Sequence, residues 1–389
     1  MTEDLHPKPV RDAVEGVVEA RRGFLKSLAA AGAVAGAAAA GAGVIAAPHV
    51  ASAQGAGRVL RIQSSWQPGT TGFRIFETWA DGLMELTGGE VGMKAFPAGA
   101  VAGDFQLVDA VRNGVLDGMN LFTVYWAGRM PAGVFLSSYP MGLNHPHHWD
   151  MMFNSYGGNE IARELYQQNG LHFVGHVHHD MNLIHSKRPI TSLDDFNGLL
   201  LRVPGGIVAD CFASIGARTT LLPGSEVYPA LERGTIEAAD FTGPAVNYDL
   251  GFHQVTQYIV MGPPSTPCLH QPVDLMDISL SQRVWNSLSP KMQELLPQLV
   301  KAYSAVHYGA IQEANRAAWP KYAEAGVEVT RLSEEDAARF RQVAIPKWFE
   351  WANKDKDAAR LFKVHLDVMQ DPSVAYITPE DIKDHQLNL

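Results

Sequence analysis

The sequence has 389 residues, of which 46% are hydrophobic and 19% are charged, with 2 Cys and a formal net charge of -10. This composition excludes an intrinsically disordered chain, a disulfide-stapled mini-domain and a collagen-like repeat. The acidic balance also excludes the basic footprint that binds nucleic acid, and the length predicts about two domains.

Residues 1–53 have the pattern of a twin-arginine signal peptide that is cleaved. Arg21-Arg22 precedes Phe24-Leu25-Lys26, and the uncharged stretch that follows is rich in Ala and Gly. Ala51-Ser52-Ala53 supplies the small residues of a cleavage site. A membrane anchor is the alternative, since the run is long enough, but Ala and Gly gain little in hydrocarbon. We expect the mature chain to begin near Gln54, outside the cytoplasm.

The folded region opens with a strand, a helix and a second strand. Residues 58–64 are apolar enough for a strand, residues 70–86 carry apolar side chains at helical spacing, and residues 91–96 form a short strand. This order predicts an α/β fold with parallel strands.

A short internal repeat supports two lobes of this kind. Residues 110–117 and 230–237 each contain a helix end, a glycine, and an acidic residue that enters a strand. Gly114 and Gly234 both suit a left-handed position just after a helix. We therefore expect two α/β lobes with a cleft between them.

The cleft is expected at the carboxyl ends of strands, where open α/β sheets bind ligands. The residues at those ends include aromatic rings, hydroxyls, two aspartates and one arginine, namely Trp66, Tyr125, Asp180, Arg202, Gly205, Asp240 and Phe241. Apolar walls with one guanidinium suit a small organic anion.

Arg202 is the candidate anion ligand. It follows the apolar Leu199-Leu200-Leu201, and Pro204-Gly205 leads from it into a predicted helix. A helix N-terminus beside an arginine favours a carboxylate. The alternative is an ordinary ion pair with a neighbouring acidic side chain.

The run from Ile190 to Gly205 resembles the segment of TRAP transporter solute-binding proteins, of the DctP type, that presents a carboxylate-binding arginine. Further similar stretches span most of the mature chain in the family's order, at residues 96–99, 106–114, 125–128 and 222–234. The sequence is most similar to the branch that binds 2-oxo and related monocarboxylic acids.

The resemblance implies a periplasmic receptor, not an enzyme, that delivers its ligand to membrane permease subunits as a monomer or homodimer. Its two-lobe fold implies one lobe from residues 58–180 and about 268–310, and a second from residues 181–267 and about 311–389. A long helix over residues 290–318, bounded by Pro290 and Pro320, is expected to brace both lobes.

By the same resemblance, Arg202 is the carboxylate clamp, and Asp240-Phe241 stands where the branch has Glu-Trp ligands for a cation. Asp240, the Phe241 carbonyl and Asp180 could hold Na⁺ or Ca²⁺ through oxygen atoms. Met181 occupies the position of the branch's third ligand, a Gln, although Asp180 and Asn182 flank it. If these carboxylates do not point inward, the site is free of metal.

A metal-dependent hydrolase of small acids is the alternative function. His145, His147 and His148 lie in one stretch, and His176, His178 and His179 in another, so a zinc centre completed by Asp180 or Asp240 is conceivable. No H-E-x-x-H spacing is present, and we expect His145 to begin a surface helix. Cys211 and Cys268 are expected to be unpaired thiols.

Overall fold

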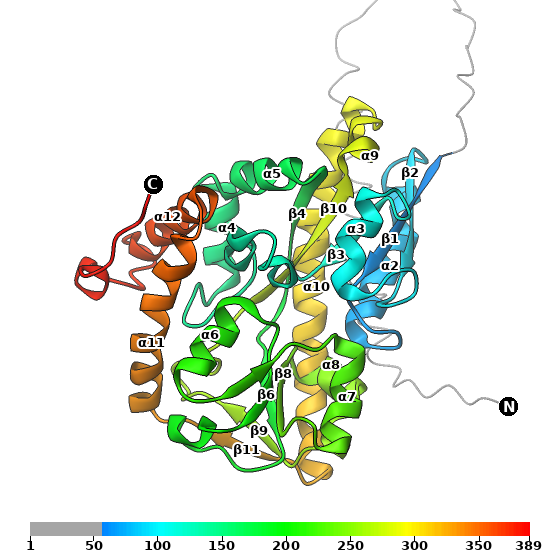
Figure 1. Cartoon of the computed structure of the whole chain (residues 1–389). Coiled ribbons are helices and arrows are strands. Elements are labelled where there is room, and N and C mark those ends of the chain that lie inside the picture. Colours follow the sequence, from blue (N-terminus) through cyan, green and yellow to red (C-terminus); the bar gives the residue numbers. More distant parts are fainter. Residues whose placement is uncertain (1–56) are drawn as a thin grey trace, which may run out of the picture. The chain divides into compact units, whose positions relative to one another are not determined.

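The computed structural model describes residues 57–389, and Val59–Leu389 form one compact unit (Figure 1). The predicted signal peptide, 1–53, lies outside the described residues. Two sheets organise the unit, and we call the five-stranded sheet with its helices the first lobe and the six-stranded sheet with its helices the second lobe.

The first lobe contains a mixed sheet in the order β2-β1-β3-β10-β4. Its strands are β1 (Arg58–Ser64), β2 (Val91–Phe96), β3 (Gly118–Leu121), β4 (Leu171–Asp180) and β10 (Asp274–Ser281). β1 and β3 are parallel, as predicted, but β10 runs antiparallel to both β3 and β4. The prediction of parallel strands is therefore wrong for β10, because this strand enters the sheet from the second lobe.

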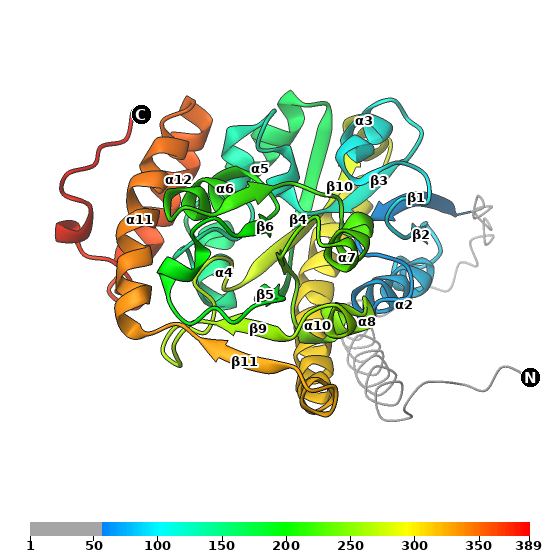
Figure 2. The ribbon, with the colours of Figure 1, turned by 60° about the horizontal axis from the view of Figure 1, so that its bottom comes forward.

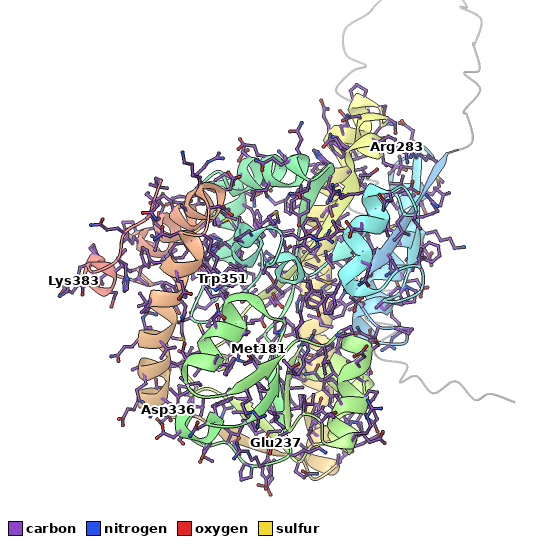
Figure 3. All side chains as sticks on the ribbon, in the orientation of Figure 1. Met181, Glu237, Arg283, Asp336, Trp351 and Lys383 are labelled. Atoms are coloured by element: carbon purple, nitrogen blue, oxygen red, sulfur yellow. The ribbon has the colours of Figure 1, made fainter. Side chains whose placement is uncertain are left out.

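The second lobe contains a sheet in the order β11-β9-β5-β8-β6-β7. Its strands are β5 (Leu183–Ser186), β6 (Leu200–Arg202), β7 (Arg218–Thr220), β8 (Ala238–Phe241), β9 (Tyr258–Met261) and β11 (Glu328–Arg331). The chain crosses between lobes from β4 to β5, through Met181 and Asn182, and returns from β9 to β10. Met181 is labelled at the crossing in Figure 3.

A single long helix, α10 (Pro290–Glu324), accompanies both lobes (Figure 2). Ser289 caps its N-terminus by accepting a hydrogen bond from the Met292 amide, as a serine at this position commonly does. Helix α10 packs against β4 and α2 (Thr71–Leu86) of the first lobe and against α8 (Pro244–Asp249) of the second. The helix begins at the predicted Pro290 but continues through Pro320, so Pro320 does not end it.

The helix ends in the internal repeat, residues 110–117 and 230–237, have the predicted geometry. α3 (Leu107–Arg112) and α7 (Gly224–Arg233) are each followed by a glycine with positive φ, 76° at Gly114 and 73° at Gly234. Without a Cβ, glycine adopts this conformation at little cost, so the chain can turn back toward the sheet after each of the two helices.

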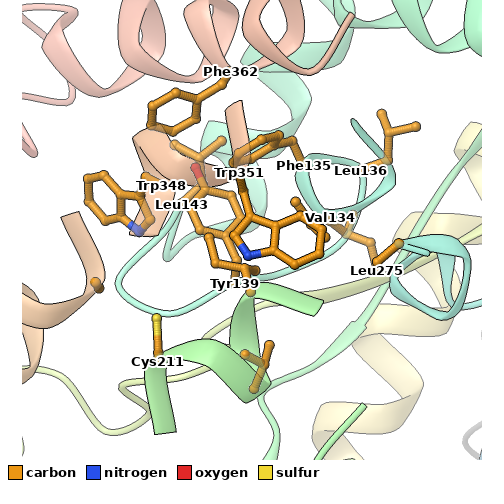
Figure 4. Packing of buried hydrophobic residues seen from close by; sticks show 14 of the residues in the cluster. Val134, Phe135, Leu136, Tyr139, Leu143, Cys211, Leu275, Trp348, Trp351 and Phe362 are labelled. Atoms are coloured by element: carbon orange, nitrogen blue, oxygen red, sulfur yellow. The ribbon is translucent and has the colours of Figure 1, made fainter. Parts of the chain in front are cut away.

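The C-terminal helices do not follow the predicted division of the chain. α11 (Glu334–Ala352) packs against α6 (Gly206–Ser214) of the second lobe, but α12 (Lys356–Gln370) packs against α4 (Pro146–Asn154) and α5 (Gly158–Gln168) of the first. The assignment of residues 311–389 to the second lobe therefore fails for α12. Its attachment to the first lobe is aromatic, since the Phe362 ring centroid lies 4.8 Å from that of Phe135 and 6.4 Å from that of Tyr139 (Figure 4).

One short helix, α9 (Gln282–Asn286), precedes α10. No helix in residues 57–389 is long and apolar enough to span a membrane.

Candidate functional site

A small cavity lies where side chains of both lobes meet. It has a volume of about 20 Å³ and is lined by Phe122, Val124, Tyr125, Asn182, Arg202, Pro204, Phe241, Thr242 and Asp274. The structure thus brings together four of the predicted site residues: Tyr125, Asn182, Arg202 and Phe241. This volume holds roughly one water molecule, so an organic ligand requires the lobes or side chains to move apart.

Arg202 is held rigidly at the end of β6. Its side chain is buried, and both Nε and Nη2 donate to the Leu222 carbonyl, at 3.1 and 2.9 Å. Nη1 donates to the Asp240 carbonyl at 2.8 Å, and Nη2 lies 3.3 Å from the Tyr125 hydroxyl of the first lobe. The guanidinium also lies over the Phe241 ring, 5.1 Å from its centroid.

These partners exclude the alternative interpretation of Arg202, an ordinary ion pair with a neighbouring acidic side chain. Within residues 57–389, Arg202 forms no salt bridge with a carboxylate, because its hydrogen-bond partners are carbonyls and a hydroxyl. The acidic group that interacts with it through space is Asp104, whose pKa burial raises to about 6. A buried guanidinium without a direct carboxylate partner attracts an anionic ligand.

A hydrogen-bonded chain of polar side chains contributes Asn182 and Asp274 to the cavity lining. The Asp274 carboxylate accepts from Gln271 Nε2 at 3.0 Å, and Gln271 Oε1 accepts from Asn182 Nδ2 at 3.0 Å. This order fixes the orientation of both amides, because a carboxylate only accepts. Asn182 Oδ1 is then left buried with no hydrogen-bond partner among the described residues.

Sequence reasoning missed Asp104, Gln271 and Asp274. Asp274 is the first residue of the buried strand β10, and Gln271 lies three residues before it, so both stand at the end of a buried strand, as Asp240 does. Ser137 Oγ and the Ser138 amide also donate to Asp274. The carboxylate is therefore fixed from two sides.

Asp240 is balanced by a histidine. His270 Nε2 lies 3.0 Å from Asp240 Oδ1, and His270 Nδ1 lies 3.6 Å from the sulfur of Cys268. Burial alone would lower the pKa of His270, but its interactions with the neighbouring Cys268 sulfur and Asp240 carboxylate raise it to about 10. The imidazolium thus compensates the buried Asp240, whose Oδ2 has no partner in the described part of the chain.

Asp180 has a separate set of partners. Its carboxylate accepts from Asn315 Nδ2 at 2.7 Å, from Gln312 Nε2 at 3.3 Å and from the Met181 amide at 2.8 Å. Burial raises its pKa to about 6. Asp180 therefore ties the end of β4 to α10, while Asp240 contacts the segment before β10, and neither residue is among those that line the cavity.

Trp66 and Gly205, also predicted for the site, support it from outside the cavity lining. The Trp66 ring packs against those of Phe122, His179 and His307, with centroids 5.2–5.8 Å apart. Gly205 begins α6 with a φ of 87°. Such a positive φ is where glycine is favoured, so Gly205 permits the sharp turn from β6 to α6.

The predicted surface helix at the histidine cluster is confirmed. His145 caps α4, and its side chain accepts a hydrogen bond from the His147 amide. Cys211 and Cys268 are both buried free thiols.

The family model DctP, described as bacterial extracellular solute-binding protein, family 7, matches residues 62–355 of this chain. The chain belongs to this family. Among its curated relatives is a monocarboxylate 2-oxoacid-binding periplasmic protein of Nostoc sp., 26% identical over 76% of this chain and 79% of the relative. The family identity favours a solute receptor over the hydrolase that the histidines offered.

Solved structures share the fold. A TRAP periplasmic solute binding protein from Rhodobacter sphaeroides, in an apo open structure, is 28% identical, with a TM-score of 0.63, and the match covers 82% of this chain and 99% of that one. One from Colwellia psychrerythraea, with bound calcium and pyruvate, is 22% identical, with a TM-score of 0.71 over 84% and 99%.

One of the contacts between the lobes lies at the N-terminus of α2. Asp249 Oδ2, on α8, accepts from the Thr71 amide at 2.6 Å and from Thr71 Oγ1 at 2.7 Å. A carboxylate there satisfies a free helical N–H and complements the helix dipole. The contact is independent of the cavity residues, so it can be changed without altering the ligand's own contacts.

We expect Asp249→Asn to shift the ligand-free protein toward an open arrangement. Losing the charge weakens the two hydrogen bonds by about 1 kcal/mol, which changes the ratio of closed to open forms about 5-fold. Small-angle scattering should show a larger radius of gyration, with Glu77→Gln, an exposed change on α2, as the control. An unchanged radius would show that other contacts determine closure.

Proposed function

We propose that this member of the family is the periplasmic receptor of a TRAP transporter and binds a small monocarboxylic acid, of the 2-oxo or a related class, between its lobes. The observation that supports this most directly is Arg202, a buried guanidinium that lines the cavity without a carboxylate partner within residues 57–389. The name of the Nostoc relative supports the same ligand class. Delivery to membrane permease subunits and export through the twin-arginine route are parts of this proposal.

Different cavity residues bind different parts of the ligand. Arg202 binds the carboxylate, replacing its contact with the Tyr125 hydroxyl, and Phe241 and Phe122 cover the apolar part of the ligand. Asn182, which also lines the cavity, has a free acceptor in its Oδ1. An acceptor cannot bond a 2-oxo oxygen directly, so the arrangement selects a short acid whose 2-hydroxyl donates to Asn182 Oδ1, or a 2-oxo acid whose oxygen reaches it through a cation.

Two buried oxygens without partners are the candidate ligands of a hard cation. Asp240 Oδ2 and Asn182 Oδ1 both lack a partner among the described residues, and Na⁺ and Ca²⁺ take oxygen ligands. With the Phe241 carbonyl, these groups would hold the ion, which would supply positive charge to the ligand's oxygens. The His270 imidazolium also lies beside Asp240, so the negative charge of Asp240 is compensated even when no ion is bound.

Calorimetry with pyruvate and propionate tests the proposal, after endogenous ligand has been removed and its identity determined by native mass spectrometry. We expect pyruvate to bind more tightly, because propionate lacks the 2-oxo group. Dialysis against EDTA in sodium-free buffer should weaken pyruvate binding, and Ca²⁺ or Na⁺ should restore it. Failure of every small acid to bind would contradict the receptor proposal, whereas binding that is indifferent to cations would contradict only the ion.

A further inference from the structure

A group of metal-ligating side chains lies apart from the ligand cavity. His176 and His178 share one face of β4, as alternate residues of a strand do, and Asp150 projects toward them from α4. Nε2 of His176 lies 3.1 Å from Asp150 Oδ1, and Nε2 of His178 lies 3.2 Å from the same oxygen. The three ligand atoms all lie within 4.8 Å of one another.

The two Nε2–Oδ1 separations are close to those of a metal site. Bonds of about 2.1 Å from zinc to nitrogen or oxygen place the ligands of a tetrahedral ion about 3.4 Å apart. The two Nε2–Oδ1 separations therefore need to lengthen by only a few tenths of an ångström. Two imidazoles and a carboxylate are also the donor set of many open zinc sites.

The surroundings give the site both rigidity and access. The His176 ring stacks on Phe153 of α4, with centroids 4.1 Å apart, and the His178 amide donates to Ser304 Oγ of α10 at 2.9 Å. The histidine side chains are 7% and 5% exposed, but that of Asp150 is 44% exposed. An ion can thus enter from the Asp150 side, where water can complete its coordination.

We propose that Asp150, His176 and His178 bind one divalent transition-metal ion of the zinc class. The ion links α4 to β4, the strand that leads through Met181 and Asn182 into the second lobe. It replaces the hydrogen bonds that the two imidazoles share with Asp150 by three coordinate bonds. The site shares no residue with the cavity, so it is independent of the proposed acid-binding function.

The test is titration of the tag-free, chelator-treated mature protein with Zn²⁺ by calorimetry, in the presence of saturating Ca²⁺ and pyruvate. We expect one ion per chain and a higher midpoint of thermal unfolding. Co²⁺ should give the visible absorption of a low-coordinate complex. Asp150→Asn keeps an acceptor for both imidazoles but removes the anionic ligand, so Zn²⁺ affinity should fall at least 10-fold, the lower bound for disturbing even an outer-shell partner.

Two further variants make the assignment decisive. His178→Gln should also weaken Zn²⁺ binding at least 10-fold. His147→Gln removes an exposed imidazole of the same helix and should leave the affinity unchanged. The proposal fails if no Zn²⁺ binds, if Asp150→Asn and His178→Gln bind as tightly as the wild type, or if His147→Gln abolishes binding.

Discussion

Arg202→Lys is expected to weaken binding of the carboxylate ligand about 10- to 150-fold, or by about 1.5–3 kcal/mol, the usual contribution of a charged hydrogen-bond pair. The guanidinium uses Nε, Nη1 and Nη2 to bind the carbonyls of Leu222 and Asp240 and still faces the cavity. An ammonium group has three donors and no planar fork, so it cannot satisfy both carbonyls and a bidentate carboxylate together.

Calorimetry with the retained ligand measures this loss. Arg218→Lys is the matched control, because Arg218 lies exposed on the adjacent strand β7, whose Thr220 pairs with Arg202. Circular dichroism should confirm that both variants fold. Equal affinities of wild type and Arg202→Lys would remove Arg202 from the ligand site.

Asp240→Asn is expected to lower the free energy of unfolding at pH 7 by about 3 kcal/mol, since removing one partner of a buried ion pair leaves the other charge unpaired. Asp240 is fully buried, and its Oδ1 contacts His270 Nε2 at 3.0 Å. If Asp240 served only as a cation ligand, this variant would weaken ligand binding and leave the fold intact. The structure adds a stability cost, because the partner of Asp240 is part of the protein.

The pH dependence gives this pair a recognisable signature. The pKa of His270 is raised to about 10, above the ordinary value of 6.5 that applies in the unfolded chain. The stabilisation is therefore complete below pH 6.5 and is lost as the pH rises toward 10. Between pH 7 and 9 this stabilisation should therefore decrease, by about 3 kcal/mol at most.

Urea unfolding at pH 7, 8 and 9 measures both effects. Wild type should lose stability over this range more steeply than Asp240→Asn or His270→Gln. Asp367→Asn, which alters an exposed ion pair with Lys363 on α12, should keep the wild-type slope. Parallel slopes for wild type and Asp240→Asn would show that the pair is not ionised in the folded protein.

Local patterns in the sequence were sufficient for much of the fold. The strand and helix spacing predicted β1, α2 and β2, and the two glycines predicted the turns after α3 and α7. Arg202 was found because an apolar strand, an arginine and a Pro-Gly turn are consecutive. Each of these features depends on neighbouring residues, whose geometry is constrained by backbone sterics and by periodicity.

The tertiary structure alone decided which distant groups became partners. His270 is 30 residues from Asp240, and Asn315 is 135 residues from Asp180, so no local pattern connects them. The antiparallel insertion of β10 and the packing of α12 on the first lobe likewise depend on where the chain returns after crossing between lobes. Buried charges need compensation from whatever side chains packing brings near, and this is why the sequence identified the acidic residues but only the assembled fold identified what balances them.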